Sequence, residues 1–365
     1  MTRPADESPA LDRPAPVRAG EELDLTRLAP WVRDALGSPA AQVTVAQFPG
    51  GHSNLTYWVR VGDDEYVLRR PPFGANVKSA HDMRREYRIL SNLSRHYPRA
   101  PEPVAFCDDP AVLGCEFYLM RRVRGAIIRR TPPPGIDLSP PVAADLCEAF
   151  VDTLAELHSL EPDAIGLGDF GRPDGYVQRQ IEGWTRRYHG ARTDDVPAVD
   201  RVARWLADHM PASLPGRIIH NDYKFDNLVV DPAEPTRIVG ILDWEMATVG
   251  DPLMDLGTAL AYWVEAADPA PLRAVAFGPT ALPGMFTRQQ LVDAYARRTG
   301  RDVAHVVFYY AYGLFKTAVI VQQIYYRYVR GFTRDERFAR LGDVTRLLVD
   351  AAAAAIDRGA ITIAA

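Results

Sequence analysis

One stretch near the middle of the chain constrains its fold more than any other. Two short apolar runs, Leu228 to Val230 and Ile238 to Leu242, flank a polar segment that contains a proline, residues 231–236. Apolar runs of this length on either side of turn-forming residues predict two strands joined as a β-hairpin. Because a hairpin returns the chain to the end from which it started, residues just before the first strand and just after the second should meet.

Polar side chains stand at both of these positions. Asp222 and Asn227 precede the first predicted strand, and Asp243 follows the second. Such oxygen ligands suit Mg²⁺, which takes few protein ligands and completes its shell with water and phosphate oxygens. In phosphoryl transfer one Asp accepts the proton of the attacking hydroxyl, an Asn holds a metal ion and a second Asp bridges metal and phosphates. The spacing therefore predicts Asp222 as a catalytic residue, with Asn227 and Asp243 as Mg²⁺ ligands.

A longer set of residues around the hairpin resembles the aminoglycoside phosphotransferase superfamily, within the protein-kinase-like fold. The chain looks most similar to the kinase domains related to those fused to acyl-CoA dehydrogenases. The resemblance is carried by His220, Asp222, Asn227, by Asp243-Trp244-Glu245 in place of a kinase Asp-Phe-Gly, and by Gly250-Asp251-Pro252-x-x-Asp255-Leu256. The competing interpretation is that these are turn-forming and capping residues of an unrelated α/β domain. Both halves occur in order at the right separation, which favours the resemblance.

The resemblance implies an α+β, bilobal protein-kinase-like fold. Its N-lobe is a small antiparallel β-sheet with one main helix, and its C-lobe is larger and mostly helical. We assign residues 21–122 to the N-lobe and residues 123–365 to the C-lobe, and we expect residues 1–20, rich in Pro and charges, to be a disordered tail. The implied activity moves the γ-phosphate of ATP, with Mg²⁺ as a second cofactor, to a hydroxyl of a small molecule.

The resemblance also implies roles for residues around the predicted base. His220 is expected to brace the catalytic loop by hydrogen bonds rather than to transfer protons. Asp255 should accept hydrogen bonds from the loop backbone, and Asp251 with Pro252 should shape the turn before it. Lys224 stands where many protein kinases place a lysine near the γ-phosphate, and we predict that it is catalytic. The alternative for Lys224 is an exposed loop lysine.

A glycine-bearing loop precedes this region. Short runs predict three strands, at residues 42–47, 55–61 and 65–69. Kinases place a flap over the nucleotide phosphates in this order. Gly50 and Gly51 would let the backbone approach phosphate oxygens, and Ser53 or Asn54 could add donors. The alternative is an ordinary hairpin.

The third predicted strand ends in two arginines. Arg69 occupies the place where kinases carry a lysine that contacts the α and β phosphates. Arginine keeps the charge and adds a fork of donors, and Arg70 is the alternative phosphate contact. Ser79 can cap a following helix with an apolar stripe through residues 83–93, and Glu86 borders that stripe. Glu86 either pairs with Arg69, as in kinases, or is a solvated carboxylate beside neighbouring arginines.

The connection between the predicted lobes should contact the base of the nucleotide. Residues 117–120 read as an edge strand that leads into a hinge at residues 121–125, so Met120 and Val123 are expected at the adenine. Beyond the hinge, Arg129 and Arg130 either meet an anionic acceptor or form a solvated face.

Composition narrows the classes of partner. The chain has 365 residues, is 47% hydrophobic and carries a formal charge of -5, so it can bury a large core and has no overall basic field for a nucleic acid. Residues 1–20 contain no apolar signal core, and three cysteines without metal-ligand spacing suit reduced thiols, so we expect a cytoplasmic protein. No obligate protein partner is evident. Residues 303–324 are apolar, but Lys316, Gln322 and Gln323 favour a buried helix over a membrane span.

The acceptor is the least constrained part of the prediction. The acyl-CoA-dehydrogenase-linked branch favours a hydroxyacyl group or a related hydroxylated metabolite. One alternative is an aminoglycoside or other antibiotic. Another is a non-catalytic, nucleotide-binding pseudokinase scaffold, for which Arg69 in place of lysine speaks. Metal-dependent hydrolysis by the same acids fits less well, because two protein metal ligands with a nucleotide flap suit transfer from ATP.

Overall fold

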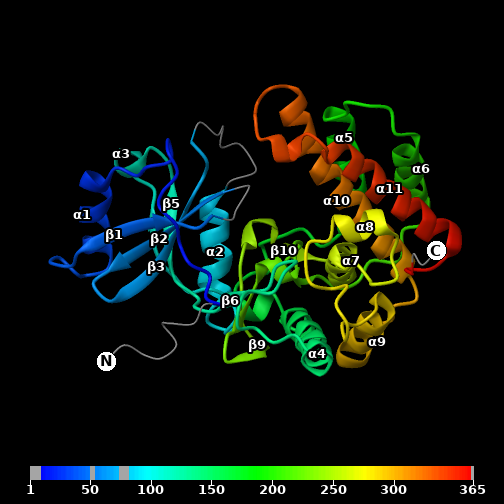
Figure 1. Ribbon diagram of the computed structural model, residues 1–365, viewed down its shortest axis with the longest axis horizontal. Coiled ribbons are helices and arrows are strands. Elements are labelled where there is room, and N and C mark those ends of the chain that lie inside the picture. Colours follow the sequence, from blue (N-terminus) through cyan, green and yellow to red (C-terminus); the bar gives the residue numbers. More distant parts are fainter. Residues whose placement is uncertain (1–9, 50–53, 74–81, 363–365) are drawn as a thin grey trace.

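The computed structural model describes residues 10–49, 54–73 and 82–362. Two parts lie side by side along its long axis, a β-sheet with its helices and a larger, mostly helical part (Figure 1). Residues 121–125 connect them, since β5 ends at Arg121 and β6 begins at Ala126. This is the α+β, two-lobed arrangement that the resemblance implies. The division at residue 122 stays a prediction.

The first part is built on a five-stranded antiparallel sheet of order β1-β2-β3-β5-β4. The strands are β1 Val43–Gln47, β2 Leu55–Val61, β3 Asp64–Arg70, β4 Pro103–Cys107 and β5 Phe117–Arg121. The prediction that residues 117–120 form an edge strand is wrong, because β5 lies between β3 and β4. All four of these residues are buried, as expected for a strand covered on both faces. The strand at this edge of the sheet is β4, whose residues are mostly half-buried and do not alternate between buried and exposed.

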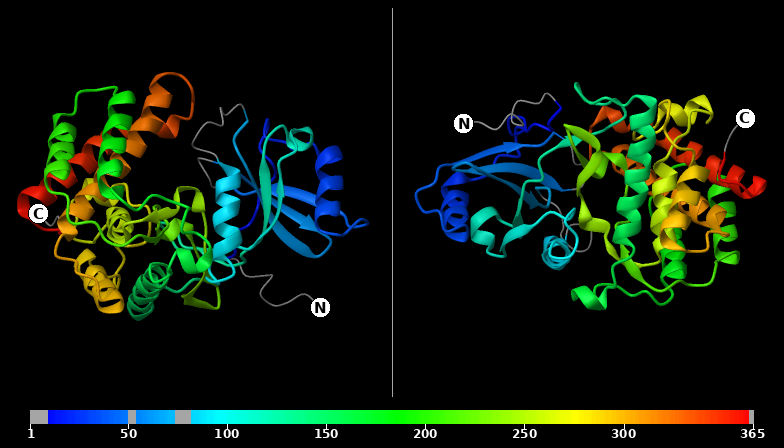
Figure 2. Two further views of the ribbon diagram at one scale, coloured as in Figure 1. Left: turned by 180° about the vertical axis from the view of Figure 1, so that it is seen from behind. Right: turned by 90° about the horizontal axis from the view of Figure 1, so that it is seen from below.

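Helices cover both faces of this sheet. Helix α1, Leu25–Ala35, packs Leu28 and Val32 into a cluster with alternate side chains of β2, while α2, Met83–Leu93, belongs to the main core on the side facing the helical part (Figure 2). A short helix α3, Pro110–Leu113, joins β4 to β5. The N-cap of α2 is Asp82, whose side chain accepts from the Arg85 N–H. Helix α2 therefore begins later than expected, and Ser79 lies outside the described residues.

The N-terminal segment departs from the predicted disordered tail. Ala10 is buried, and Ala15 forms an antiparallel bridge with Gln47 at the end of β1. The backbone N–H of Asp12 donates to the carbonyl of Gly125 over 3.2 Å. Residues 10–20 are thus held against the sheet and the connecting segment, and the prediction is wrong for them. Residues 1–9 lie outside the described part of the chain.

The predicted hairpin is confirmed in the second part. Strands β8, Leu228–Asp231, and β9, Glu234–Ile241, pair antiparallel with Leu228 opposite Ile241. The second strand starts earlier than its apolar run. The remaining strands here are β6 Ala126–Ile127, β7 Arg217–Ile219 and β10 Thr248–Gly250, with β6 against β8 and β7 against β10. Residues 220–227, the predicted catalytic segment, lie between β7 and β8. The two pairings therefore fix both ends of this segment.

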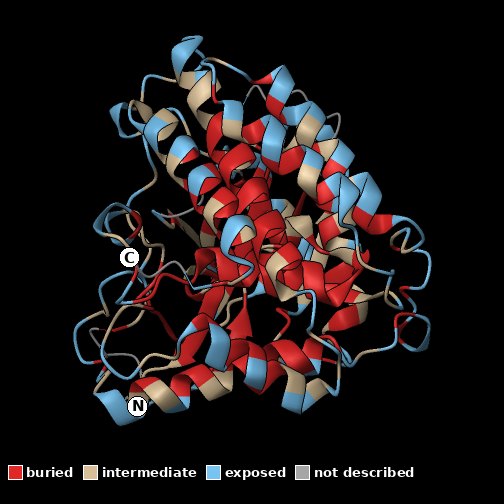
Figure 3. Cartoon of the chain, turned by 90° about the vertical axis from the view of Figure 1, so that its right-hand side faces the viewer, coloured by how far each residue is buried: buried red, intermediate tan, exposed pale blue. Residues whose placement is uncertain are grey.

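Helices α7, Pro252–Tyr262, and α10, Val306–Val329, form the centre of the second part. All residues of α7 are buried, as expected for a helix that is apolar around most of its circumference. Buried residues are concentrated in the middle of this part and exposed ones on its outer surface (Figure 3). The two helices cross closely: a Cβ on Gly257 would lie 2.1 Å from the Tyr309 carbonyl oxygen, and one on Gly313 would lie 2.1 Å from the Gly257 oxygen. Only glycine allows this approach. No helix in the described ranges is long and apolar enough to cross a membrane.

The other helices of this part surround that central pair. They are α4 Pro140–Leu157, α5 Tyr176–Gly190, α6 Pro197–Asp208, α8 Ala270–Ala274, α9 Arg288–Thr299 and α11 Leu341–Arg358. Single 3-10 turns are η2 Asp163–Ile165, η3 Phe225–Asn227, η4 Trp244–Met246 and η5 Glu336–Phe338.

Candidate active site

The carboxylate of Asp222 lies in the segment between β7 and β8 and is held on both oxygens. The Tyr262 hydroxyl donates to Oδ1 over 2.7 Å, and Asn227 Nδ2 donates to Oδ2 over 2.8 Å. Lys224 Nζ lies 2.6 Å from Oδ2. Burial raises the pKa of Asp222, but the neighbouring ammonium and hydroxyl groups outweigh it, so the pKa lies below its ordinary value. The carboxylate is therefore ionised and firmly oriented.

Lys224 is not the exposed loop lysine of the alternative interpretation. Its side chain is 19% exposed, and Nζ lies 4.7 Å from the centre of the Tyr262 ring. Burial lowers the pKa of Lys224, but Tyr262 and Asp222 outweigh it and the pKa is raised. The structure thus places a permanent positive charge beside Asp222. Its contact with a phosphate stays a prediction.

Two residues at this site have a left-handed backbone. Asn221 has φ 66° and Asp243 has φ 68°, and they are the non-glycine residues with positive φ among those the structure describes. Such conformations cost of order 1–3 kcal/mol each and persist only where the surroundings enforce them. Both flank the predicted hairpin, so the strain is concentrated where the polar side chains meet.

Arg69 joins the sheet, helix α2 and the segment after β9. Its Nη2 lies 2.8 Å from Asp243 Oδ1, and its Nε lies 3.3 Å from Glu86 Oε2. Glu86 is 2% exposed, so the interpretation as a solvated carboxylate is wrong and the predicted ion pair is present. Burial raises the pKa of Glu86 despite Arg69. Burial lowers the pKa of Arg69, but Glu86 and Asp243 outweigh it and the pKa is raised.

The loop after β1 is described only at its two ends, residues 48–49 and Asn54. Asn54, predicted as a phosphate donor, donates through Nδ2 to Glu245 Oε2 over 2.7 Å. Arg69 Nη2 lies 3.7 Å from the same oxygen. Glu245 was quoted only as part of a motif, and sequence reasoning missed its contact with the loop, which joins positions 191 residues apart. Gly50, Gly51 and Ser53 lie outside the described residues, so their contact with phosphates stays a prediction.

His220 braces the segment, and its contacts determine which ring nitrogen carries the proton. The backbone N–H of Asp222 donates to Nδ1 over 3.2 Å, while Nε2 lies 3.0 Å from the carbonyl oxygen of Leu242. An N–H can only donate and a carbonyl can only accept, so the neutral ring carries its proton on Nε2. Burial lowers the pKa of His220, which keeps the ring neutral.

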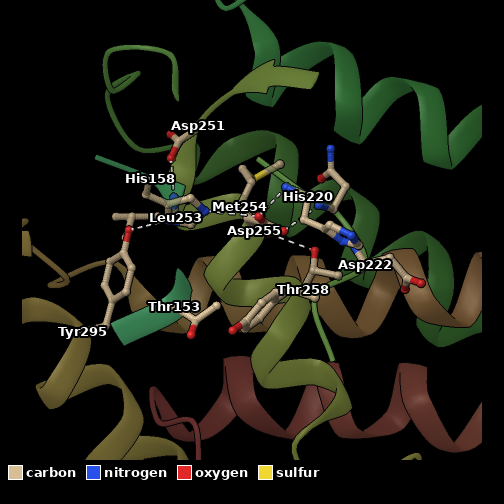
Figure 4. A network of polar contacts seen from close by, with 12 residues as sticks. Thr153, His158, His220, Asp222, Asp251, Leu253, Met254, Asp255, Thr258 and Tyr295 are labelled. Carbon is tan, nitrogen blue, oxygen red and sulfur yellow. Dashed lines mark hydrogen bonds and ion pairs between the residues drawn. The ribbon is translucent and has the colours of Figure 1, made fainter. Parts of the chain in front are cut away.

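Asp255, in the first turn of α7, holds the backbone just before Asp222, and Asp251 stands at the start of the same helix (Figure 4). Asp255 Oδ2 accepts the N–H of His220 and Oδ1 accepts the N–H of Asn221, each over 2.7 Å. His158 Nε2 lies 3.1 Å from Asp255 Oδ2. Asp251 instead caps α7, because its Oδ1 accepts the Leu253 N–H over 2.8 Å. Both aspartates therefore act on backbone groups and stand back from the pocket.

A pocket lies between the sheet and the hairpin. It brings together Arg69, Asn227 and Asp243 with Met120 of β5 and Val123 of the connecting segment. The lining also includes Asp12, Phe48, Thr56, Val67, Pro101, Arg121, Arg122, Gly125, Ile127, Arg129, Asp226, Val229 and Leu242. The lining mixes apolar side chains, from the sheet, the connecting segment and the hairpin, with charged ones that include Arg69 and Asp243. A mixed lining of this kind can hold a ligand that carries both an aromatic base and phosphates.

Asp12 is a pocket residue that sequence reasoning missed. Arg129 Nη1 lies 3.3 Å from its Oδ1. Arg129 pairs with Asp12 at the pocket wall although its side chain is 49% exposed, and Arg130 donates to the Ala274 carbonyl over 2.8 Å. The choice between an anionic acceptor and a solvated face stays a prediction. No local signal marks Asp12, because the segment around it reads as an unstructured tail.

The donor set at the hairpin fits a magnesium ion. Asn227 Nδ2 donates to Asp222, which leaves its amide oxygen for a cation, and the Asp243 carboxylate is 31% exposed in the same pocket. No group of three or more His, Cys, Asp or Glu within residues 10–49, 54–73 and 82–362 is arranged to hold a metal. An amide and a carboxylate leave the remaining positions to phosphate and water, as Mg²⁺ prefers.

Known structures share this architecture. A provisionally assigned aminoglycoside phosphotransferase from Ralstonia eutropha JMP134 is 32% identical, with a TM-score of 0.78 over 92% of this chain and 99% of that one. Aminoglycoside phosphotransferase APH(4)-Ia, in a ternary complex with ADP and hygromycin B, gives a TM-score of 0.57 over 91% and 99% at 14% identity. The second likeness shows the fold alone. Together they confirm the predicted kinase-like fold.

Curated sequences agree with the structures. Acyl-CoA dehydrogenase family member 11 from Gallus gallus is 35% identical over 301 residues, which are 80% of this chain and 38% of the relative. The chain thus spans about two-fifths of that relative's length. The model of the "Phosphotransferase enzyme family" matches residues 44–291, which include β1, the pocket, the hairpin and α7. The resemblance drawn from the sequence is confirmed, and the chain belongs to the phosphotransferase enzyme family.

Proposed function

We propose that this protein transfers the γ-phosphate of Mg-ATP to a hydroxyl of a small hydroxylated metabolite. One observation carries the proposal: Asp222 is ionised and oriented beside Asn227, which shares a pocket with Arg69 and Asp243. In this proposal Asp222 is the proton acceptor, Asn227 and Asp243 are the metal ligands, and Arg69 is the cation that binds phosphate. These are the groups that phosphoryl transfer needs.

Each side chain has a distinct task in this proposal. Asp222 orients the acceptor hydroxyl and takes its proton, while Lys224 balances charge beside it. Asn227 and Asp243 would hold Mg²⁺, which when bound supplies charge neutralisation on the triphosphate. Arg69 contacts the phosphates through the donors that Glu86 leaves free. Positioning and electrostatics contribute most of the rate, because little covalent chemistry falls to the protein.

A hydroxyacyl group is the favoured acceptor. A small hollow beside Lys224 and Tyr262 has mostly apolar and aromatic walls, formed by Phe150, Phe225, Ala259, Trp263, Phe277, Gly278 and Thr280. Such walls suit the carbon atoms next to an acceptor hydroxyl, but the hollow is too small to enclose an aliphatic chain. The names of the curated relatives point the same way, since they are acyl-CoA dehydrogenase family members. An antibiotic acceptor is the alternative.

The test is a search for a metabolite that gains one phosphate. A cell extract and a panel of hydroxyacyl thioesters, hydroxy acids and one aminoglycoside are incubated with Mg-ATP, and the products are resolved by mass spectrometry. Asp222→Ala serves as the inactive control. Phosphorylation of a hydroxyacyl compound by the wild type alone supports the proposal. Transfer only to the aminoglycoside selects the antibiotic alternative, and no transfer to any compound rejects the proposal.

One observation favours a second candidate, a scaffold that binds nucleotide without turnover. Arg69 replaces the usual lysine, and its Nη2 lies 2.8 Å from Oδ1 of Asp243, a predicted metal ligand. A scaffold would bind Mg-ATP but release no phosphate and modify no acceptor. Calorimetric binding of Mg-ATP combined with ATP turnover across the acceptor panel separates the two candidates.

A further inference from the structure

Lys316 is a buried cation behind the catalytic segment. It lies within the long helix α10, is 1% exposed, and its Nζ is 5.9 Å from the centre of the Trp184 ring. Its Nζ donates to the carbonyl oxygen of Asn221 over 2.5 Å and lies 3.5 Å from the Asn221 side-chain oxygen. In the described part of the chain, no carboxylate oxygen lies within ion-pair distance of Nζ. An ammonium group in this position is costly to bury.

The partner of Lys316 is one of the two strained residues. Asn221 has φ 66°, and its N–H is held by Asp255 Oδ1. Its side-chain Nδ2 donates to the Met246 carbonyl and to the Tyr176 hydroxyl, each over 3.1 Å. Lys316 completes this set by holding the carbonyl. The Asp255 carboxylate therefore accepts the N–H of Asn221, while the Lys316 ammonium donates to its carbonyl oxygen.

The gripped carbonyl belongs to the peptide bond that leads into Asp222. On the other side of that bond, the Asp222 N–H donates to His220 Nδ1. Rotation of this peptide plane would break both hydrogen bonds and turn the Asp222 side chain away from Tyr262. The plane is planar and rigid, so holding its oxygen sets the direction in which the next residue leaves it.

We propose that Lys316 is a positioning residue for phosphoryl transfer, which holds the Asn221 carbonyl and thereby the orientation of Asp222. The inference rests on the proposed function, in which Asp222 receives the acceptor proton. Lys316 does not touch the pocket residues described above. Its position is 94 residues from Asp222 in the sequence, and helix α10 brings it there through its packing against α7.

The charges around Lys316 come from three elements. Asp222 and Lys224 face it from the catalytic segment, Asp255 from α7 and Arg187 from α5. Burial lowers the pKa of Lys316 to about 8, against the attraction of the two aspartates. The grip on Asn221 is therefore strongest below this pH, because a charged donor makes the stronger hydrogen bond.

Lys316→Met is the test variant, and Gln322→Met is its matched control. Gln322 lies on the same helix, is 3% exposed, and donates to the Ala191 carbonyl over 2.8 Å, far from the catalytic segment. Both variants remove a buried donor and leave a carbonyl without it. Lys316→Gln, which keeps a neutral donor, is the conservative variant. Three measurements follow: thermal midpoint, amide exchange of the peptide spanning residues 219–223, and phosphate release from Mg-ATP with water as acceptor.

For Lys316→Met we expect a thermal midpoint no lower than that of Gln322→Met, since an unpaired buried charge is also removed. Exchange of residues 219–223 rises at least about tenfold, and kcat falls roughly tenfold to a hundredfold with KM for Mg-ATP within about twofold. Lys316→Gln recovers part of the kcat. Unchanged exchange, or a kcat within about twofold of the wild type, overturns the inference. A wild type that phosphorylates no compound of the acceptor panel refutes the proposed function, whereas the exchange comparison decides the role of Lys316 by itself.

The wild type alone provides a second test, which does not depend on folding of the variants. Its kcat at saturating Mg-ATP should decline as the pH rises through about 8, where Lys316 loses its proton. Lys224 and Tyr262 have raised pKa values and titrate above this window. A kcat that is constant from pH 7 to about 9.5 contradicts the inference.

Discussion

Arg69 Nη2 lies 2.8 Å from Asp243 Oδ1, so the arginine in the place of the kinase lysine touches the carboxylate predicted to bind metal. The same guanidinium reaches Glu86 through Nε at 3.3 Å. One buried side chain thus connects helix α2 to the end of the hairpin. Because a guanidinium has five donors in a fork, it can hold both carboxylates and still present N–H groups to a phosphate.

Replacing Arg69 should affect both folding and nucleotide binding. Arg69→Met leaves the carboxylate of Glu86 buried and uncompensated, so we expect the free energy of unfolding to fall by about 3–5 kcal/mol. Arg69→Lys should lose less stability but raise KM for Mg-ATP, because one ammonium group cannot hold both carboxylates and a phosphate. The control is Arg84→Met on α2, the helix that carries Glu86, because the exposed pair of Arg84 with Glu116 should contribute about 1 kcal/mol or less. Urea unfolding and nucleotide titration provide the measurements; equal losses for the two methionine variants would contradict this account.

Removing the carboxylate of Asp222 should separate turnover from binding. For Asp222→Ala we expect turnover to fall on the order of 10² or more, with the Kd for Mg-ATP within about twofold, since the proposed role of this side chain is toward the acceptor hydroxyl and not the triphosphate. Asp231→Asn, on the surface of the same hairpin, is the matched control. Phosphate release and calorimetry measure the two quantities. If Asp222→Ala phosphorylated the acceptor near the wild-type rate, the base would be assigned to the wrong residue.

Asp243 should matter only when the metal is present. We expect wild-type protein to bind ATP more tightly with Mg²⁺ than with a chelator, and Asp243→Ala to lose most of that difference, because the variant lacks one of the two predicted protein ligands. Titrations of each protein with ATP in Mg²⁺ and in chelator measure the difference directly. An Asp243→Ala protein that keeps the full Mg²⁺ dependence would assign the ion to other ligands.

Two buried histidines should make the protein sensitive to mild acid. Burial lowers the pKa of His158 and of His220, so both stay neutral in the folded state while the unfolded chain takes up protons near pH 6.5. Their stability contribution is complete above about pH 6.5 and is lost as the pH falls, at up to about 1.4 kcal/mol per pH unit for each histidine. Urea unfolding at a series of pH values between 7.5 and 5.5 measures the slope. His158→Gln should reduce it, whereas the surface variant His209→Gln should not; identical slopes for His158→Gln and the wild type would refute the assignment.

Local patterns in the sequence were sufficient for the hairpin and for the polar residues at its ends. Two apolar runs and a turn fix strands β8 and β9, and chain connectivity alone then brings Asp222, Asn227 and Asp243 to one end. The motif spacing also carried the family and the fold, because the order of these residues along the chain is itself specific. The ion pair between Arg69 and Glu86 was predictable for the same reason.

Tertiary structure decided everything that depends on which distant segments meet. The order of β5 in the sheet, the docking of Asp12 on the connecting segment and the grip of Lys316 on Asn221 have no local signature. A buried strand resembles an edge strand over five residues, a proline-rich segment resembles a tail until a partner surface holds it, and a lysine in an apolar helix is only an anomaly. The physical reason is that burial and hydrogen bonding are properties of pairs. In each of these three cases the second member of the pair lies roughly 50 to 110 residues away along the chain, and only packing brings the two together.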